Sequence, residues 1–272
     1  MSQGIIHSTV YPVRMFIGNP AYRILLFLKA RYGFAKRYTE TVLRCYGYTL
    51  RVPDIASFIY QFKDIFVEEY YHFSSNSLSP VIIDCGANIG TSCLYYKSIF
   101  PDATVTAFEA DPSIAVILKE NLEKNSVTGV TVINKAVWIH DKGVEFASDG
   151  ADGGSIHGLA EKVSVPSVRL RDFIIVTGHV DFLKVDIEGA EVDVIADCAD
   201  SLKNVDSVYV EYHAWKGQEQ RLDILLSTLT ESGFTYYIQS MNDVPSPLRK
   251  TGTIPATDMQ LHVFAIRKNT QR

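Results

Sequence analysis

Residues 84–90, DCGANIG, combine a carboxylate with two glycines directly after the apolar residues PVII. A strand that ends in such a turn and opens a helix presents free backbone N–H groups, and Gly86 and Gly90 let a ligand approach the main chain closely. The dinucleotide fingerprint G-x-G-x-x-G is not met, because Asn88 stands between the glycines. Asp84 is poorly placed for a pyrophosphate and well placed for an ammonium group, such as the one that S-adenosylmethionine carries beside its sulfonium.

A second carboxylate falls at the end of the next apolar run. In AFEADP, Glu109 follows the glycine turn by about 20 residues, where a carboxylate can accept hydrogen bonds from two ribose hydroxyls. Asp111 is better suited to cap the helix that follows. Because an acid at position 109 fits NAD and S-adenosylmethionine equally, it predicts a ribose without choosing the cofactor.

Further acids gather at the ends of two later strands. DFLKVDIEGAE and VYVEYH contain Lys184, Asp186, Glu188, Glu191, Glu211 and His213. The carboxyl ends of parallel strands meet at the edge where open α/β sheets bind their ligands. Glu191 has a plainer role, since acids stabilise the first turn of a helix.

The residues around these motifs predict the elements that position them. From residue 80 onward, apolar strand-like runs alternate with amphipathic helical stretches, which is the pattern of βα units around a parallel sheet. Strands are predicted at VIIDC, TVTAFE, VTVINK, DFLKVD, SVYVEY, FTYYIQ and LHVFAI, with the last two forming an antiparallel hairpin. Helices are predicted at 111–125 and 222–233. The roughly 45 residues between the third and fourth strands are expected to hold an inserted hairpin and a Gly/Asp-rich loop near the site.

The first 75 residues are predicted to form a separate helical segment, before a catalytic domain at 76–272. One helix begins at Asn19 and Pro20 and ends near Gly33. A second helix over 53–70 places one apolar stripe on the core: Ile55, Phe58, Ile59, Phe62 and Phe66.

The beginning of the chain is basic. Residues 1–39 carry six Lys or Arg and no acid, which leaves 20 basic against 31 acidic residues in the remainder. The first helix therefore has basic residues beside an apolar face. It either docks on the body of the protein, covers a substrate pocket, or makes a peripheral contact with a membrane.

The composition excludes several classes of protein. At 272 residues, with 47% hydrophobic and 21% charged, the chain has the composition of a globular protein with one main domain. The four scattered cysteines favour a reduced, cytoplasmic protein, and no signal peptide is recognised. The longest apolar run, ILLFL, is far shorter than the roughly 20 residues that a membrane span needs. The acidic body disfavours nucleic acid as a partner, because phosphate binding requires concentrated positive charge.

In order and spacing, the motifs VIIDCGANIG, AFEADP, NKAVW, GGSI, DFLKVDIEGAE and VYVEYH resemble the FkbM family of S-adenosylmethionine-dependent methyltransferases, in the class I superfamily. The resemblance implies a Rossmann-like α/β fold, with a seven-stranded, mostly parallel sheet whose last strand is antiparallel. It also implies O-methylation of a hydroxyl on a small molecule, sugar, glycolipid or natural-product scaffold. Cys85 and Ala110 depart from the family's more usual Val and Pro, at positions outside the expected contacts.

The resemblance also assigns binding residues by position. Asp84, Gly86, Asn88 and Gly90 would surround the methionine end of S-adenosylmethionine, Glu109 the ribose, and Ala136 and Val137 the adenine. Two other readings of the turn stay open, an NAD-dependent oxidoreductase and a non-catalytic module that only binds the cofactor. Methylation of base amino groups is disfavoured, because DIEG replaces the Asn/Asp-Pro-Pro-aromatic turn of such enzymes.

A hydroxyl acceptor has a pKa of roughly 15, like that of water, and needs help to lose its proton. We expect His213 to accept that proton, while Asp186, together with Glu188, orients the histidine or the acceptor. In an alternative arrangement, Asp186, Glu188 and a third oxygen ligand hold Mg²⁺, which lowers the pKa of the hydroxyl. Two carboxylates two residues apart suit either role.

Overall fold

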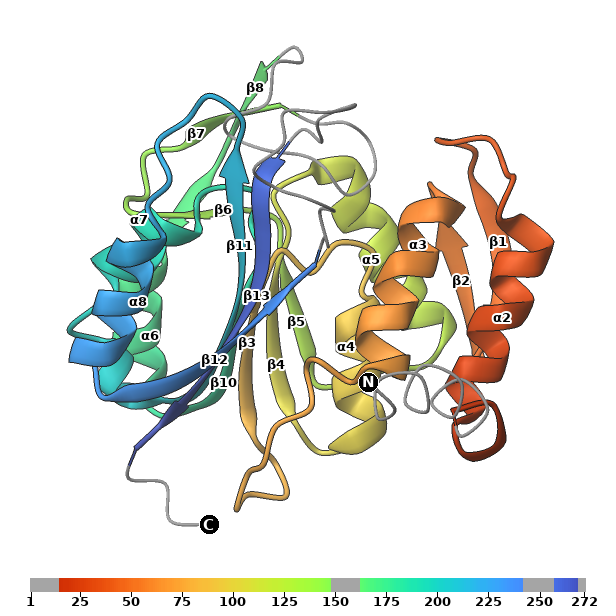
Figure 1. Ribbon diagram of the computed structural model, residues 1–272, viewed down its shortest axis with the longest axis horizontal. Coiled ribbons are helices and arrows are strands. Elements are labelled where there is room, and N and C mark those ends of the chain that lie inside the picture. The colour runs from red at the N-terminus through yellow and green to blue at the C-terminus, as the bar shows by residue number, and fades with distance from the viewer. Residues whose placement is uncertain (1–14, 148–161, 242–256, 269–272) are drawn as a thin grey trace, which may run out of the picture.

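A seven-stranded sheet forms the centre of the molecule (Figure 1). The computed structural model describes residues 15–147, 162–241 and 257–268. The strands lie in the order β12 (Phe234–Ser240), β13 (Thr257–Arg267), β11 (Val205–Trp215), β10 (Val180–Val185), β3 (Val81–Cys85), β4 (Thr104–Phe108) and β5 (Val130–Ile133). β13 is antiparallel to both neighbours, and the strands from β11 to β5 are parallel. The predicted Rossmann-like α/β fold, with its antiparallel last strand, is confirmed.

Helices cover both faces of the sheet. α4 (Thr91–Ile99) and α5 (Pro112–Lys124) lie on one side, and α6 (Leu170–Thr177), α7 (Glu191–Asp197) and α8 (Leu222–Glu231) lie on the other (Figure 1). α5 begins as predicted, since the Asp111 side chain accepts hydrogen bonds from the N–H groups of Ser113 and Ile114. Its predicted inward residues are all buried: Ile114, Ile117, Leu118 and Leu122. Local capping and helical spacing were therefore sufficient to place this helix.

The chain order of the strands opens a crevice at one edge of the sheet. From β3 the chain runs outward through β4 to β5, and it then returns to the other side of β3 to form β10. The connections after β3 and β10 leave in opposite directions, which is the switch point where open α/β sheets bind ligands.

The N-terminal segment is not purely helical. α2 (Pro20–Tyr32) forms as predicted, with the Asn19 side chain accepting from the Tyr22 N–H. A hairpin of β1 (Thr41–Cys45) and β2 (Tyr48–Val52) then follows, which the sequence reading missed. Its two turn residues, Tyr46 and Gly47, both have positive φ, the signature of a tight hairpin turn. The alternation of apolar and polar residues in TVLRC and YTLRV, on either side of YG, was the sequence signal that could have predicted this hairpin.

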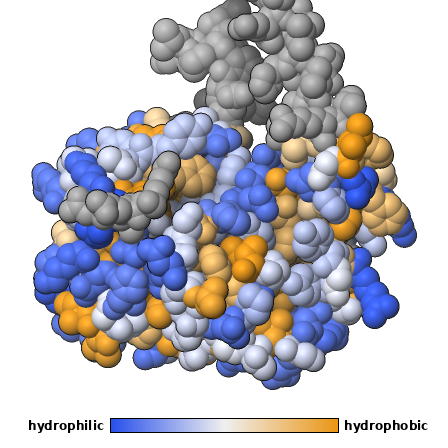
Figure 2. Space-filling model, turned by 90° about the horizontal axis from the view of Figure 1, so that it is seen from below, coloured by the Kyte–Doolittle hydropathy of each residue, from blue (hydrophilic) through white to orange (hydrophobic). Residues whose placement is uncertain are grey.

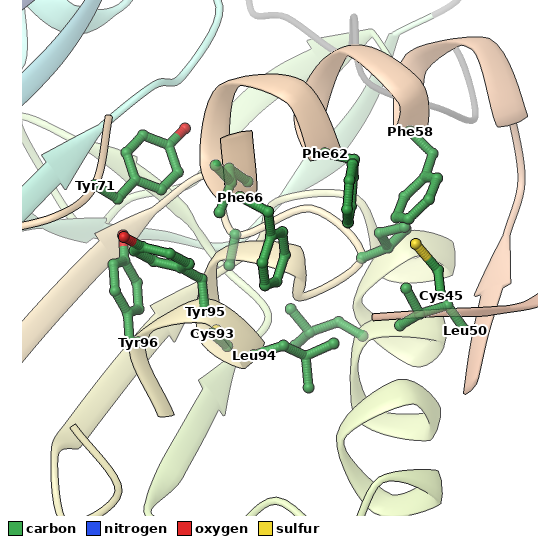
Figure 3. Close-up of a cluster of buried hydrophobic side chains, with 14 of the residues drawn as sticks. Cys45, Leu50, Phe58, Phe62, Phe66, Tyr71, Cys93, Leu94, Tyr95 and Tyr96 are labelled. Carbon is green, nitrogen blue, oxygen red and sulfur yellow. The ribbon is translucent and has the colours of Figure 1, made fainter. Parts of the chain in front are cut away.

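A π-helical turn completes the second predicted helix. α3 (Ile55–Phe62) continues directly into η1 (Lys63–Val67), and all five residues of the predicted stripe are buried. The wider π turn keeps Phe66 in line with Phe62, and their rings stack with centroids 5.1 Å apart. Figure 3 shows these rings beside Tyr95 of α4. One hydrophobic cluster thus joins the N-terminal segment to the sheet and its helices.

An inserted unit separates β5 from β10. It holds β6 (Ala136–Trp138), β7 (Val144–Ala147), β8 (Lys162–Val165), β9 (Ser167–Arg169) and α6. β7 and β8 pair antiparallel, which confirms the expected hairpin. The expected Gly/Asp-rich loop lies outside the described residues.

The surface on the opposite side from this hairpin has a mixed character. Seen from below, orange hydrophobic residues stand among blue and white ones (Figure 2). Within the described residues, none of the helices has the length and apolar character needed to cross a membrane.

Candidate active site

A cavity of about 720 Å³ opens at the carboxyl edge of the sheet. This volume is within the range of small-molecule sites. Its floor comes from the turns after β3, β4 and β10, and from β11. The N-terminal segment forms its opposite wall, through residues of α2, α3 and η1. The cavity therefore lies at the switch point on the predicted carboxyl edge, between the sheet and the N-terminal segment.

The glycine turn brings backbone against the cavity. Gly86 has φ +83, and a Cβ built on it would come within 1.9 Å of the carbonyl oxygen of Asp186. Gly86 and Asn88 line the cavity, and Asn88 also has a positive φ, of 48°. Gly90 has φ +88, caps α4, and lies outside the cavity wall. Glycine is therefore required at position 86 by its positive φ and by the backbone of Asp186, and the turn presents Gly86 and Asn88 to the cavity.

Asp84 lies beneath this turn. Its side chain is fully buried, accepts a hydrogen bond from Ser92 Oγ at 2.5 Å, and lies 3.5 Å from Lys184 Nζ. Lys184 Nζ in turn donates to the carbonyl oxygen of Gly86 at 2.6 Å and lies 3.2 Å from Asp186. The structure therefore places Asp84 behind the cavity wall, as the anchor of a lysine that joins the turns after β3 and β10.

Glu109 presents its carboxylate at one end of the cavity. Its two oxygens accept from the backbone N–H groups of Asn88 and Asp111, each at 2.8 Å. Burial raises the pKa of Glu109 to about 7, against the opposing effect of these hydrogen bonds. Ala136 and Val137 line the same cavity, so with Gly86 and Asn88 five of the seven expected binding residues meet there.

Asp186 and Glu188 follow β10 and line the cavity. Burial raises the pKa of Asp186 to about 7, and the negative charge of Glu211 adds to the effect, while Lys184 opposes it. Burial also raises the pKa of Glu188 well above its usual value. Glu188 has a positive φ of 57°, a strained conformation for this residue type that is typical of functional turns.

His213 lies behind these acids and is not part of the cavity wall. Its Nδ1 is 3.1 Å from Glu191, and its Nε2 is 3.3 Å from Glu211 and 3.6 Å from Glu188. Burial lowers the pKa of His213, but the charges of Glu188 and Glu191 outweigh burial and raise it well above its usual value. Three carboxylates therefore enclose the buried imidazole and favour its protonated form. Glu191 does begin α7, as expected, and its carboxylate also holds His213.

Glu211 is a site residue that sequence reasoning did not assign. It lines the cavity, and its carboxylate accepts from Tyr209 Oη at 3.2 Å and from Gln260 Nε2 at 2.8 Å. Burial raises the pKa of Glu211, but its hydrogen bond with His213 and the charge of His213 lower it to about 2. The sequence signal that could have identified Glu211 as a site residue was its position on β11, two residues before His213 and on the same strand face.

The other end of the cavity is polar and aromatic. Lys63 Nζ pairs with Asp64 at 2.8 Å, and Gln239 Nε2 of β12 donates to the Tyr70 hydroxyl at 2.7 Å. Tyr60 and Gln61 of α3 contribute to the same wall. These residues come from the N-terminal segment and the last hairpin, and the sequence offered no local motif for them.

The positions of these carboxylates can be compared with the Mg²⁺ site that was expected from the sequence. Within the described residues at this edge, Asp186, Glu211 and His213 place ligand atoms within 4.8 Å of one another, and Glu188 is not in this group. Mg²⁺ prefers oxygen ligands in octahedral geometry. Since one of the three ligand atoms is an imidazole nitrogen and not an oxygen, the group fits Mg²⁺ poorly.

A seven-stranded sheet with this strand order and a glycine turn at its switch point defines a Rossmann-like α/β fold of the methyltransferase class. A solved SAM-dependent methyltransferase from Agrobacterium tumefaciens shares it, with a TM-score of 0.50 at 10% sequence identity, over 88% of this chain and 73% of that chain. The profile of the methyltransferase FkbM domain matches residues 84–236, more than half of the chain. The protein therefore belongs to the FkbM methyltransferase family.

Named relatives agree with this membership. Methyltransferase 1 of Beauveria bassiana is 28% identical over 214 residues, which cover 69% of this chain and 85% of that protein. The 2-O-methyltransferase NoeI of Sinorhizobium fredii is 28% identical over 155 residues, which cover 49% of this chain and 63% of that protein. The chain is thus similar along most of its length to a methyltransferase of comparable size.

Proposed function

We propose that this methyltransferase uses S-adenosylmethionine to methylate a hydroxyl of a small-molecule, saccharide or natural-product acceptor. The observation that carries the proposal is the meeting, in one cavity, of the Cβ-less turn at Gly86, the carboxylate of Glu109 and the carboxylate of Asp186. Similarity to a protein named as a 2-O-methyltransferase supports a hydroxyl acceptor.

The residues present fit the cofactor. Gly86 and Asn88 offer backbone at close approach, and Ala136 and Val137 offer an apolar wall for the adenine. Glu109 already accepts one backbone N–H at each oxygen, and each oxygen keeps a lone pair for a ribose hydroxyl. Asp84 and Gly90 do not line the cavity. Asp84 fixes Lys184, and Gly90 fixes the start of α4. When bound, S-adenosylmethionine supplies an electrophilic methyl group.

Asp186 is the residue that we assign to proton removal, in place of His213. It faces the cavity, and a base with a pKa of about 7 is suited to act near neutral pH. Glu211, with a pKa of about 2, stays ionised beside it and favours protonation of Asp186. Because their environments separate the pKa values of these two carboxylates, Asp186 can act as the base while Glu211 remains a fixed negative charge. His213 is a positioning residue, which holds Glu211 and Glu188 from behind.

The N-terminal segment, residues 1–75, and the last hairpin supply the acceptor side in this proposal, and the rest of residues 76–272 supplies the cofactor side. Hydroxyl, amide and charged groups line the acceptor side, including those of Tyr60, Gln61 and Asp64. Such groups exchange hydrogen bonds with the several hydroxyls of a saccharide-like acceptor, while tyrosine rings pack against its carbon faces.

Two measurements on the purified chain test the proposal. In calorimetric titrations, S-adenosylhomocysteine should bind and NAD⁺ should not. With S-adenosylmethionine carrying a labelled methyl group, label should pass to a panel of hydroxylated acceptors. Asp186→Asn should reduce turnover at least about 100-fold while retaining S-adenosylhomocysteine affinity. Asp223→Asn, on the exposed face of α8, is the matched control.

Three other results would each contradict a part of this proposal. Binding of NAD⁺ alone would contradict the cofactor, and binding of S-adenosylhomocysteine without any label transfer would favour a non-catalytic module. Loss of turnover on EDTA treatment, with recovery on adding Mg²⁺, would favour a metal in place of Asp186 as the activating group.

A further inference from the structure

The outward side of α2 exposes large apolar side chains. α2 buries Ala21, Leu25 and Leu28 against the core. Its opposite face and the flanking residues form what we call the α2 outer surface, whose apolar members are Phe16, Ile17, Leu26, Phe27 and Phe34. Phe27 is 63% exposed and Phe34 is fully exposed. Several large exposed apolar side chains on and beside one helix are more typical of an interaction site than of plain surface.

Basic residues stand among these apolar ones. Arg23, Lys29, Arg31 and Lys36 interrupt or flank the α2 outer surface, and residues 15–39 contain no acid. Within the described part of the chain, none of these four is ion-paired with a carboxylate, whereas Arg37 pairs with Asp54. The surface is therefore positively charged as well as apolar, in a protein whose net charge is −5.

The apolar side chains at the start of this surface are held in place. Residues 15–18 form a helical turn before α2. Arg23 Nη1 donates to the carbonyl oxygens of Phe16 at 3.0 Å and Ile17 at 3.2 Å. The turn is thus fixed against α2, so docking would not first have to order it.

This surface adjoins the cavity. Lys29 belongs to α2 and also lines the cavity, as does Tyr60 of α3, whose side chain is largely exposed. A partner seated on the α2 outer surface would therefore lie beside the cavity entrance.

We propose that the α2 outer surface docks on an anionic lipid bilayer, with its apolar side chains in the interface and its basic side chains against the headgroups. Apolar residues flanked by Lys and Arg on one helix face are the composition of interfacial helices. A second copy of the chain fits less well, because a twofold interface would bring the same basic residues of two copies together. Docking would place the cavity beside the bilayer, within reach of an acceptor carried on a lipid.

Vesicle flotation of the full chain tests this proposal without an activity assay. The protein should float with phosphatidylcholine vesicles that contain phosphatidylglycerol, much less with phosphatidylcholine alone, and less at high salt. Arg31→Gln with Lys36→Gln should weaken binding about thirtyfold, at about 1 kcal/mol for each basic residue. Phe27→Ser with Phe34→Ser should weaken it at least about tenfold. Val176→Ser, equally exposed at the end of α6, should leave binding unchanged.

The controls separate docking from misfolding and from self-association. All the altered side chains are exposed, so circular dichroism and thermal melting should match the wild type. Equal binding to charged and neutral vesicles, no binding to either, or unaltered binding by both double variants would overturn the proposal. So would analytical ultracentrifugation in which Phe27→Ser converts a dimer into a monomer, since the surface would then be an interface between copies.

Discussion

The carbonyl oxygen of Asp186 lies 1.9 Å from the point where a Cβ on Gly86 would stand. Two turns that are 100 residues apart in the sequence are therefore pressed together at backbone level. Lys184 reinforces the contact, because its Nζ donates to the carbonyl oxygen of Gly86 and pairs with Asp186. The proposed cofactor turn and the proposed base thus form one rigid unit.

Gly86→Ala should disrupt this unit. The added methyl group meets backbone that cannot move aside, and φ +83 is strained for alanine, so we expect a loss of about 2–5 kcal/mol in the free energy of unfolding. Affinity for S-adenosylhomocysteine should fall as well. Gly47→Ala is the matched control, with φ +85 and no atom within 4 Å, and should show the backbone strain alone. Equal losses in the two variants would contradict the predicted clash.

Glu109→Gln should weaken both stability and ligand binding. A glutamine amide can accept at only one end, so either the Asn88 or the Asp111 N–H loses its acceptor. We expect a loss of about 1–3 kcal/mol near pH 5, and a smaller loss at pH 8, where the ionised wild-type carboxylate carries the cost of its burial. Urea unfolding and calorimetry would measure the two effects. Glu123→Gln on the exposed side of α5 is the control, and a Glu109→Gln variant that binds as tightly as wild type would remove Glu109 from the ribose site.

The pH dependence of turnover should report Asp186. A base must be deprotonated to act, so the rate should rise about tenfold per pH unit below the pKa of about 7 and level off above it. Glu211→Gln removes a negative charge that raises this pKa, so the inflection should move to lower pH. Steady-state rates of both proteins across the pH range would show the shift. An inflection that stays in place would mean that another group controls the rate.

His213→Gln should be most destabilising in mildly acidic solution. The pKa of His213 is raised in the folded protein, so its contribution to stability is complete below about pH 6.5 and is lost as the pH rises through the raised value. Leaving Glu188, Glu191 and Glu211 without their cation should cost about 3–5 kcal/mol. Urea unfolding at pH 6 and at alkaline pH would test this, with His140→Gln as control. A loss that grows toward alkaline pH would indicate that the imidazole is neutral.

Phe62→Ala should destabilise the N-terminal segment together with the rest of the core. Phe62 is buried and stacks on Phe66 inside a hydrophobic cluster shared with α4 and α5, so we expect a loss of about 3–5 kcal/mol. The exposed neighbour Tyr60→Ala should change stability little. A single unfolding transition monitored by circular dichroism and tyrosine fluorescence is expected. Two separated transitions would show that residues 1–75 unfold independently.

Local patterns in the sequence were sufficient for the elements of the sheet. The strand and helix order from residue 80 onward, the cap at Asp111 and the antiparallel last hairpin all follow from signals within a few residues of one another. The β1–β2 hairpin was missed because it turns on Tyr46 and Gly47, and a tyrosine with positive φ is uncommon.

The sequence by itself determined which carboxylates reach the binding edge, because the alternation of side chains along β10 and β11 follows from the strand period alone. Only the tertiary structure decided what each does there. Glu211 and His213 share one strand face, yet Glu211 lines the cavity while Glu191 of α7 holds His213 behind it. The charge of a buried group depends on neighbours from distant parts of the chain, and these meet only when the sheet is assembled.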